Sequence, residues 1–261
     1  MTLTVPVYEG CCGFEAAITD DMKILRQIDG TAIELHTVIL EPLQRLTRRA
    51  ADAGFEMQVV SGFRSFERQL AIWNAKAEGL RPVLDDNNRV VNLAGLSELQ
   101  RIESIIRFSA LPGASRHHWG TDIDVCDGAA LKPGQSAQLV VSESEIGGPF
   151  YEFHRWLDKV LAETNNEGFF RPYAQDCGGI SPEPWHLSYA PMACNFQSTL
   201  TLALLRRAIE TADICFKETI MQHLESLYKR FVDISWDDYP ANTPLTIGAR
   251  MLKTLPRPKI G

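Results

Sequence analysis

The chain has 261 residues and a mass of 29.2 kDa, which suits one large domain or two small ones. Its hydrophobic residues (45%) and charged residues (23%) occur in the proportions of a globular protein, which excludes a disordered or collagen-like chain. The net charge of −7 argues against broad nucleic-acid binding, and no apolar run approaches the ~20 residues that span a bilayer. We therefore expect neither nucleic acid nor a membrane as a partner.

The N-terminal residues do not look like an export signal. There is no basic residue before Lys23 and no continuous apolar core, and acidic residues stand where a signal peptide is basic. The six cysteines are scattered, and Cys11 and Cys12 are adjacent, which favours free thiols over disulfides. Free thiols suit a reducing compartment. These observations predict a cytoplasmic protein.

Periodicity of the apolar residues predicts helices and short strands. Helical spacing predicts helices over 32–53, 65–78, 97–108, 150–165, 198–211 and 213–232. Alternation and turn residues predict short strands over 55–60, 121–125, 168–171 and 185–189. Because regular βαβ alternation is missing, we expect an α+β fold, a small antiparallel sheet flanked by helices. The pattern becomes helical after Pro191, so we expect a domain over 1–190 and a helical C-terminal extension over 191–261 packed on it.

Three segments carry more polar side chains than folding requires. They are Ser61-Gly-Phe-Arg-Ser65 with Gln69 following, Ser115-Arg-His-His-Trp-Gly-Thr-Asp-Ile-Asp124, and Glu183-Pro-Trp-His186. Two histidines and an aspartate from short segments make a three-ligand site with one open position, which is what catalytic zinc needs. Pro184 favours a bend that would bring the Glu183 carboxylate close to His186.

Together these motifs resemble the VanY-type D-alanyl-D-alanine carboxypeptidases, in the metallopeptidase group that includes lysostaphin-like enzymes. The resemblance covers about residues 36–190 and implies a zinc carboxypeptidase domain with Zn²⁺ as cofactor. It implies His117, Asp124 and His186 as the zinc ligands, and Glu183 as general base and later acid. It also implies that Arg64 neutralises charge near the scissile carbonyl or the terminal carboxylate of a murein peptide. Ser115, Gln69 and Ser61 would bind the substrate.

The chain also departs from the family pattern. The family usually has a small residue at the position of Asp122, and often an aromatic residue and Arg-Tyr where Leu187-Ser188-Tyr189 follows the last motif. Asp122 would either orient a metal-binding histidine through a hydrogen bond, without binding the metal itself, or face the solvent. His118 with Asp122 remains an alternative ligand pair.

The family contains D,D-carboxypeptidases and L,D-carboxypeptidases. A cytoplasmic D,D-carboxypeptidase would consume the pentapeptide precursors of the wall. An L,D-carboxypeptidase would instead trim recovered murein tetrapeptides by removing D-Ala, and this is the function we expect. D,D-carboxypeptidase activity on pentapeptides is the first alternative, and a non-catalytic zinc-binding interaction module is the second. The oligomeric state stays open between simple packing of the C-terminal helices and a homodimer through them.

Overall fold

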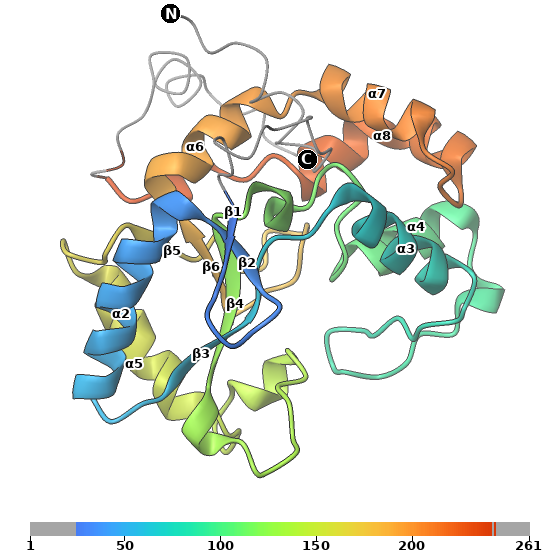
Figure 1. Ribbon diagram of the computed structural model, residues 1–261. Coiled ribbons are helices and arrows are strands. Elements are labelled where there is room, and N and C mark those ends of the chain that lie inside the picture. The colour runs from blue at the N-terminus through green and yellow to red at the C-terminus, as the bar shows by residue number, and fades with distance from the viewer. Residues whose placement is uncertain (1–24, 242, 244–261) are drawn as a thin grey trace, which may run out of the picture.

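A four-stranded antiparallel sheet lies at the centre of the computed structural model, which describes residues 25–241 and 243 (Figure 1). Its strands run in the order β3–β4–β6–β5, and a separate hairpin pairs β1 with β2. The strands are β1 Leu25–Gln27, β2 Glu34–His36, β3 Met57–Ser61, β4 Asp122–Asp127, β5 Phe169–Phe170 and β6 His186–Tyr189. The predicted α+β class with a small antiparallel sheet is confirmed.

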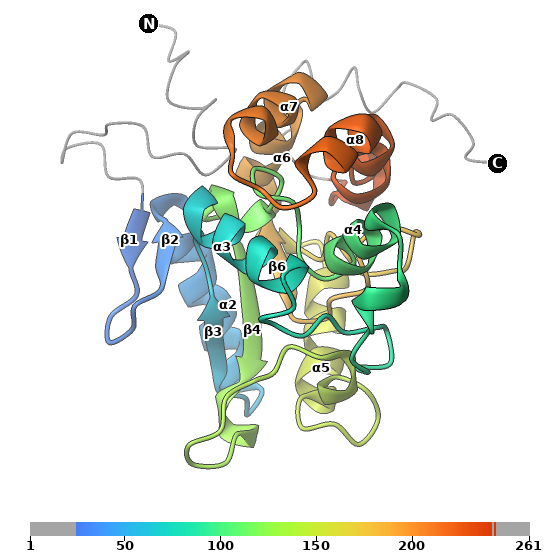
Figure 2. The ribbon, with the colours of Figure 1, turned by 90° about the vertical axis from the view of Figure 1, so that its right-hand side faces the viewer.

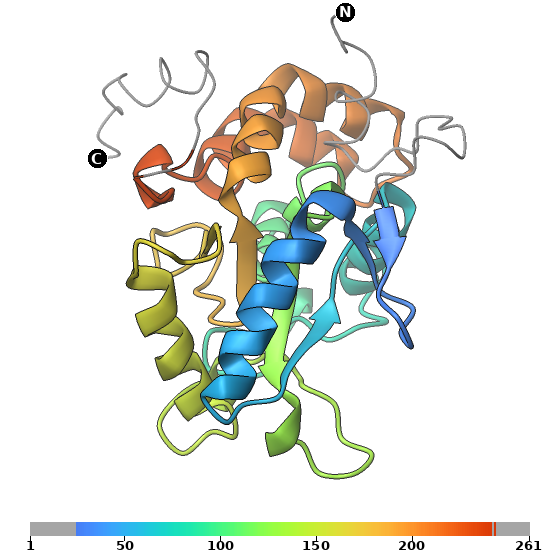
Figure 3. The ribbon, with the colours of Figure 1, turned by 60° about the vertical axis from the view of Figure 1, so that its left-hand side comes forward.

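Helices surround this sheet on several sides. The pair α2 and α5 covers one face, α3 and α4 lie on the other side, and α6–α8 lie across one end (Figures 1, 2 and 3). The helices are α2 Leu40–Asp52, α3 Phe66–Ala77, α4 Glu98–Ile106, α5 Tyr151–Ala162, α6 Ala190–Thr199, α7 Leu202–Thr211 and α8 Lys217–Phe231. None of the described helices is both long and apolar enough to cross a membrane.

The alternating sequence of β4 separates an apolar face of the sheet from a polar one. Ile123 and Val125 are fully buried in the core that β4 shares with α2 and α5. Because successive strand residues point to opposite faces, Asp122 and Asp124 project to the other face. Both aspartates are buried as well. A polar site therefore lies under the elements that cover this second face.

A second hydrophobic core joins the C-terminal helices to α3 and α4. Trp73 of α3, Ile102 of α4, Leu205 of α7 and Leu224 of α8 are all fully buried within it. Helix α6 begins directly after β6, so the helical extension continues from the sheet without a linker. The boundary at residue 190 stays a prediction, and residues 244–261 lie outside the described part of the chain, as do Cys11 and Cys12.

The helix predicted over 32–53 is wrong in its first third. Residues 34–36 form β2, a short 3₁₀ turn follows, and the α-helix begins only at Leu40. The Nδ1 atom of His36 accepts a hydrogen bond from the Val38 amide and so caps that turn. Apolar residues at this spacing fit either structure, and pairing with β1 decides for the strand.

The predicted C-terminal helices also need correction. The segment expected as one helix over 198–211 contains the end of α6 and all of α7, separated at Leu200 and Thr201. Thr201 caps α7 by accepting a hydrogen bond from the Leu204 amide. The last helix begins at Lys217 rather than near residue 213, because Phe216 has a φ of 64°, outside the helical region.

Candidate active site

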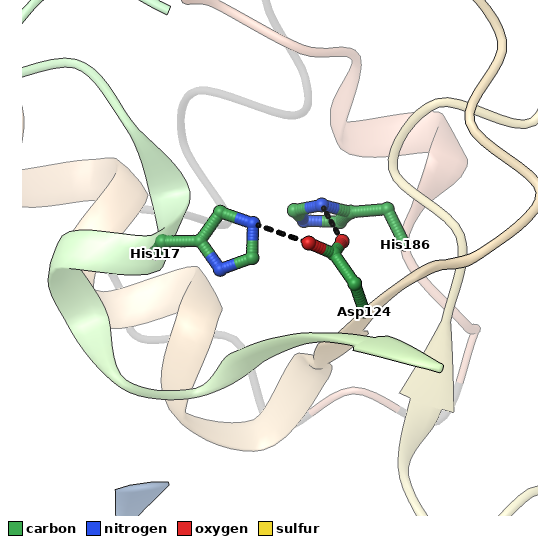
Figure 4. Close-up of side chains that lie close together, drawn as sticks. All are labelled: His117, Asp124 and His186. Atoms are coloured by element: carbon green, nitrogen blue, oxygen red, sulfur yellow. Dashed lines mark ion pairs between the residues drawn. The ribbon is translucent and has the colours of Figure 1, made fainter. Parts of the chain in front are cut away.

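His117, Asp124 and His186 converge on the polar face of the sheet (Figure 4). Asp124 and His186 are paired residues of β4 and β6, and His117 belongs to the 3₁₀ turn before β4. The Asp124 carboxylate lies 3.3 Å from His117 Nε2 and 3.2 Å from His186 Nδ1. All three side chains are buried, and one potential ligand atom of each lies within 4.8 Å of the others.

Two atoms of this group make no hydrogen bond to any described residue, although both are buried. They are Asp124 Oδ1 and His186 Nδ1. Buried polar atoms without partners are rare in proteins, and they often mark a place where an ion binds. Two imidazole nitrogens and one carboxylate oxygen are the donors of a catalytic zinc site that keeps a position open. The residues therefore fit Zn²⁺.

Hydrogen bonds on the far side of each imidazole ring fix which nitrogen faces the group. His117 Nδ1 lies 2.9 Å from the Gly62 carbonyl, so it donates there and leaves Nε2 toward Asp124. His186 Nε2 lies 3.1 Å from the Asp122 carboxylate, which leaves Nδ1 toward Asp124. A metal bound beside Asp124 would therefore meet Nε2 of His117 and Nδ1 of His186, each of which must be unprotonated to bind it.

Glu183 lies beside His186 because the chain bends at Pro184. The Glu183 carbonyl accepts from the His186 amide, and a carboxylate oxygen lies 3.5 Å from His186 Nδ1. Burial raises the pKa of the Glu183 carboxyl to about 7, a shift that the neighbouring His186 opposes. A carboxyl group with such a pKa can take up and release a proton near neutrality, as a general base must.

Arg64 is a largely buried cation next to this group. Its guanidinium donates to the Gln69 side-chain oxygen at 2.9 Å and to Ser61 Oγ at 3.4 Å. Burial lowers the pKa of Arg64, while Asp124 and Glu183 raise it. Among the described residues no carboxylate approaches Arg64 to ion-pair distance. The guanidinium is therefore available to an external anion.

Gln69 and Ser61 contact Arg64 rather than the cavity. Gln69 is fully buried, and its amide also donates to the Ala110 carbonyl at 2.7 Å. Neither Gln69 nor Ser61 lines the cavity over the site, and the contact with substrate that the resemblance implied for them stays a prediction.

That cavity has a volume of about 440 Å³, and Ser115 lines it together with Arg64, Glu183 and the three converging residues. Ser115 is 3% exposed and directly precedes the turn that carries His117. Its predicted contact with substrate stays a prediction. The cavity brings four kinds of group together: potential metal ligands, a base, a cation and a hydroxyl.

A sequence model of the family described as VanY, D-alanyl-D-alanine carboxypeptidase, matches residues 32–192. The chain belongs to the VanY family. The family predicted from the three motifs is confirmed, and so is the prediction of a metallocarboxypeptidase. The match includes all three motifs and ends inside α6, so α7 and α8 lie beyond the VanY match.

Comparison with individual proteins finds partial similarity. An uncharacterised protein of Haemophilus influenzae is 33% identical over 124 residues, which are 47% of this chain and 92% of that protein. The bifunctional D-Ala-D-Ala dipeptidase and D-Ala-D-Ala carboxypeptidase VanXYC of Enterococcus gallinarum is 28% identical over 162 residues, 59% of this chain and 68% of that protein. The crystal structure of a VanY variant from a VanB-type resistance cassette with Zn(II) superposes with a TM-score of 0.46 and 24% identity, covering 68% of this chain and 84% of that one.

The alternative ligand pair of the VanY-like motif, His118 with Asp122, does not fit the geometry. His118 Nδ1 lies 2.6 Å from the Arg64 carbonyl, and Nε2 accepts from the Gly113 amide at 3.1 Å. Both ring nitrogens are therefore used within the protein. Asp122 is fully buried, so its solvent-facing alternative is also wrong, and its carboxylate contacts His186 instead.

Sequence reasoning missed three residues of the site. Arg116 is buried and pairs with Asp122 at 2.7 Å, Tyr173 lies with its ring 5.2 Å from that of His186, and Lys76 lines the cavity. Arg116 could have been predicted, because Asp122, an acidic residue six positions later in the same motif, needs a basic partner if it is buried. Lys76 lies seven residues after Gln69, on the same face of α3. Tyr173 lies outside every motif and had no signal.

Proposed function

We propose that this VanY-family chain is a zinc-dependent L,D-carboxypeptidase that removes the terminal D-Ala from murein tetrapeptides. The observation that carries the carboxypeptidase chemistry is the convergence of three potential metal ligands, Glu183 and Arg64 on one cavity. The roles of these residues follow from what each can contribute there.

His117, Asp124 and His186 would hold the metal. Zn²⁺ bound to them supplies Lewis acidity, which polarises a carbonyl group and acidifies a water molecule. Glu183 takes the proton from the attacking water and later gives it to the leaving amine. Its burial beside His186 keeps its pKa near neutrality, which suits both transfers.

Arg64 accounts for cleavage at the end of a peptide. A guanidinium binds a carboxylate through two parallel hydrogen bonds, and no described carboxylate occupies this one. The free carboxylate of a terminal D-Ala would fill that position, with the scissile carbonyl toward the ligand group. A peptide that continues past the scissile bond brings no such carboxylate, so we infer an exopeptidase.

Two further cations on the cavity wall favour the L,D reaction. Lys76 donates to Ser109 Oγ at 2.7 Å, Arg81 also lines the cavity, and neither has a carboxylate at ion-pair distance among the described residues. A tetrapeptide presents its acidic residues one position nearer the scissile bond than a pentapeptide does. The cationic wall therefore suits a tetrapeptide better than a D-Ala-D-Ala end, which carries no charge besides the terminal carboxylate that Arg64 would bind.

The first alternative is D,D-carboxypeptidase activity on pentapeptides, which the family description favours. A non-catalytic zinc-binding module is disfavoured, because a site that only binds zinc needs no general base such as Glu183. Whether the C-terminal helices mediate a homodimer stays a prediction.

The test is a mass-spectrometric assay of the purified protein against a murein tetrapeptide and a pentapeptide, each with and without a chelator. We expect the tetrapeptide to lose one D-Ala in a reaction that the chelator abolishes. Cleavage of the pentapeptide alone would establish the D,D alternative. A protein that binds zinc but cleaves neither peptide would support the binding module. Chelator-resistant cleavage would overturn the metal mechanism.

We further propose that the reaction belongs to the recycling of murein peptides in the cytoplasm. Its support is chemical: a tetrapeptide-specific enzyme would spare the pentapeptide precursors made there. Cell fractionation with an antibody to the protein tests this location, and recovery outside the cytoplasmic fraction would overturn the recycling role.

A further inference from the structure

The Asp122 carboxylate is completely enclosed by hydrogen-bond donors. Oδ1 lies 3.1 Å from His186 Nε2 and 2.7 Å from Arg116 Nε. Oδ2 accepts from Ser188 Oγ at 3.0 Å and from Thr121 Oγ1 at 3.1 Å. A carboxylate only accepts hydrogen bonds, so His186 Nε2 donates to Asp122, and Nδ1 is the ring nitrogen that faces Asp124.

Arg116 connects this carboxylate to parts of the chain that lie beyond the family match. Its Nη1 donates to Gln197 Oε1 of α6 at 3.0 Å, and its Nη2 lies 3.4 Å from the Tyr239 hydroxyl. The Tyr239 hydroxyl in turn donates to Gln197 Oε1 at 2.8 Å. All of these side chains are buried. The family match ends at residue 192, so Gln197 and Tyr239 come from outside it.

A buried ion pair of this kind is not needed for stability. Removing two charges from water costs more than their attraction returns unless every hydrogen bond is made, and apolar residues of similar size often stabilise as well. Here every oxygen of Asp122 is paired, and the pair abuts a potential metal ligand. The arrangement resembles the carboxylate–histidine contacts that orient metal-binding imidazoles in proteins.

We propose that Asp122 and Arg116 are positioning residues for His186, and that the C-terminal segment carrying Gln197 and Tyr239 is a working part of the metal site. This inference rests on the proposed role of His186 as a zinc ligand. Asp122 holds the imidazole ring and its tautomer. Arg116 holds Asp122, and Gln197 and Tyr239 hold Arg116. The affinity for zinc would therefore depend on side chains that lie far from the ligands in sequence.

The experiment compares zinc affinity and stability in matched variants of the full chain. Zinc dissociation constants are measured by competition with a chromophoric chelator, and the visible spectrum of the Co²⁺-loaded protein reports the ligand environment. Asp122→Asn should weaken zinc binding about 10–100-fold, the typical cost of losing such a contact. Tyr239→Phe removes one hydroxyl and keeps the ring packed on Phe170 and Trp236, so it should weaken binding by a smaller factor.

Leu224→Ala is the matched control for general destabilisation. Leu224 is fully buried in α8, within the same C-terminal core, and belongs to no part of the hydrogen-bond network. This variant should lower Tm while leaving the zinc dissociation constant and the Co²⁺ spectrum unchanged. Gln197→Leu gives a second network variant should Asp122→Asn fail to fold.

The inference is overturned if the network variants lower Tm but bind zinc with wild-type affinity and give the wild-type Co²⁺ spectrum. Failure of the proposed function looks different. In that case the wild-type protein itself would bind no zinc, or His186→Ala would bind it as tightly as the wild type.

Discussion

The Arg64 guanidinium lies 2.9 Å from the side-chain oxygen of Gln69, one turn into the helix that follows. The same amide group donates to the Ala110 carbonyl, so Gln69 is held at both of its ends. Gln69 therefore orients the Arg64 guanidinium, although Gln69 itself does not line the cavity. In addition, the Arg64 amide donates to the His117 carbonyl, which ties the cation to the loop of a potential ligand.

Changing this pair should affect substrate binding more than chemistry. Arg64→Lys keeps the charge but loses the two-pronged geometry, so we expect KM to rise about 10–100-fold, the equivalent of one charge-assisted hydrogen bond. Gln69→Leu should shift KM in the same direction with a small change in kcat. Steady-state kinetics on the tetrapeptide measures both. Arg68→Lys, at an exposed position of the same helix, is the control, and an unchanged KM in Arg64→Lys would remove the assigned role.

Replacing one ligand should empty the metal site. His117→Ala and His186→Ala each leave two donors of three, so the purified variants should contain substoichiometric zinc and show no activity. Atomic absorption gives the metal content. His118→Ala is the matched control: it should keep zinc, but lose roughly 1–3 kcal/mol of stability, because the Arg64 carbonyl and Gly113 amide lose their partner. Equal zinc loss in His118→Ala would refute the ligand assignment.

Replacing the base should separate metal binding from catalysis. Glu183→Gln keeps the size of the side chain but cannot take up a proton. Zinc content should stay at the wild-type level while kcat falls about 10²–10⁴-fold. Metal analysis and kinetics on the same preparation check this. A variant that retains wild-type kcat would show that another group accepts the proton.

The cavity wall should make substrate binding depend on pH. Burial, assisted by the neighbouring Arg81 charge, lowers the pKa of Lys76 to about 8. Lys76 is therefore charged at pH 7 and loses its charge as pH rises through 8, so KM for an acidic peptide should increase between pH 7 and 9. In Lys76→Gln, KM should be higher at pH 7 and this rise should disappear. Lys229→Gln, on the exposed face of α8, should retain the wild-type profile.

The sequence predicted the convergence of the motifs because short-range features produce it. The alternation of β4 sends Asp124 to the face opposite Ile123, and the bend at Pro184 brings Glu183 to His186. Both features extend over a few residues. The family resemblance then supplied the pairing of distant segments, which spacing within one chain does not contain.

The other features of the site depend on contacts between distant residues, which the local sequence pattern does not predict. Tyr239 reaches Arg116 across 123 residues, and no local signal marks either as the partner of the other. The extra residue at Val60 is a second example. A bulge between Val59 and Ser61 turns Ser61 to the face of Asp124, whereas regular alternation would leave it beside Val59 in the apolar core.

Ser61, Asp124 and His186 occupy one transverse row of neighbouring strands. Main-chain hydrogen bonds set the spacing along this row, and the chain from Ser61 leads within three residues to Arg64. The distance between the proposed metal ligands and the proposed anion-binding Arg64 is thus set mainly by the scaffold. Consider an inhibitor in which a rigid linker of matching length joins a metal-chelating group to a carboxylate. Neither the inhibitor nor the protein would have to change conformation for it to bind, so little binding free energy would be lost to ordering. A linker of the wrong length would gain nothing from flexibility in the protein.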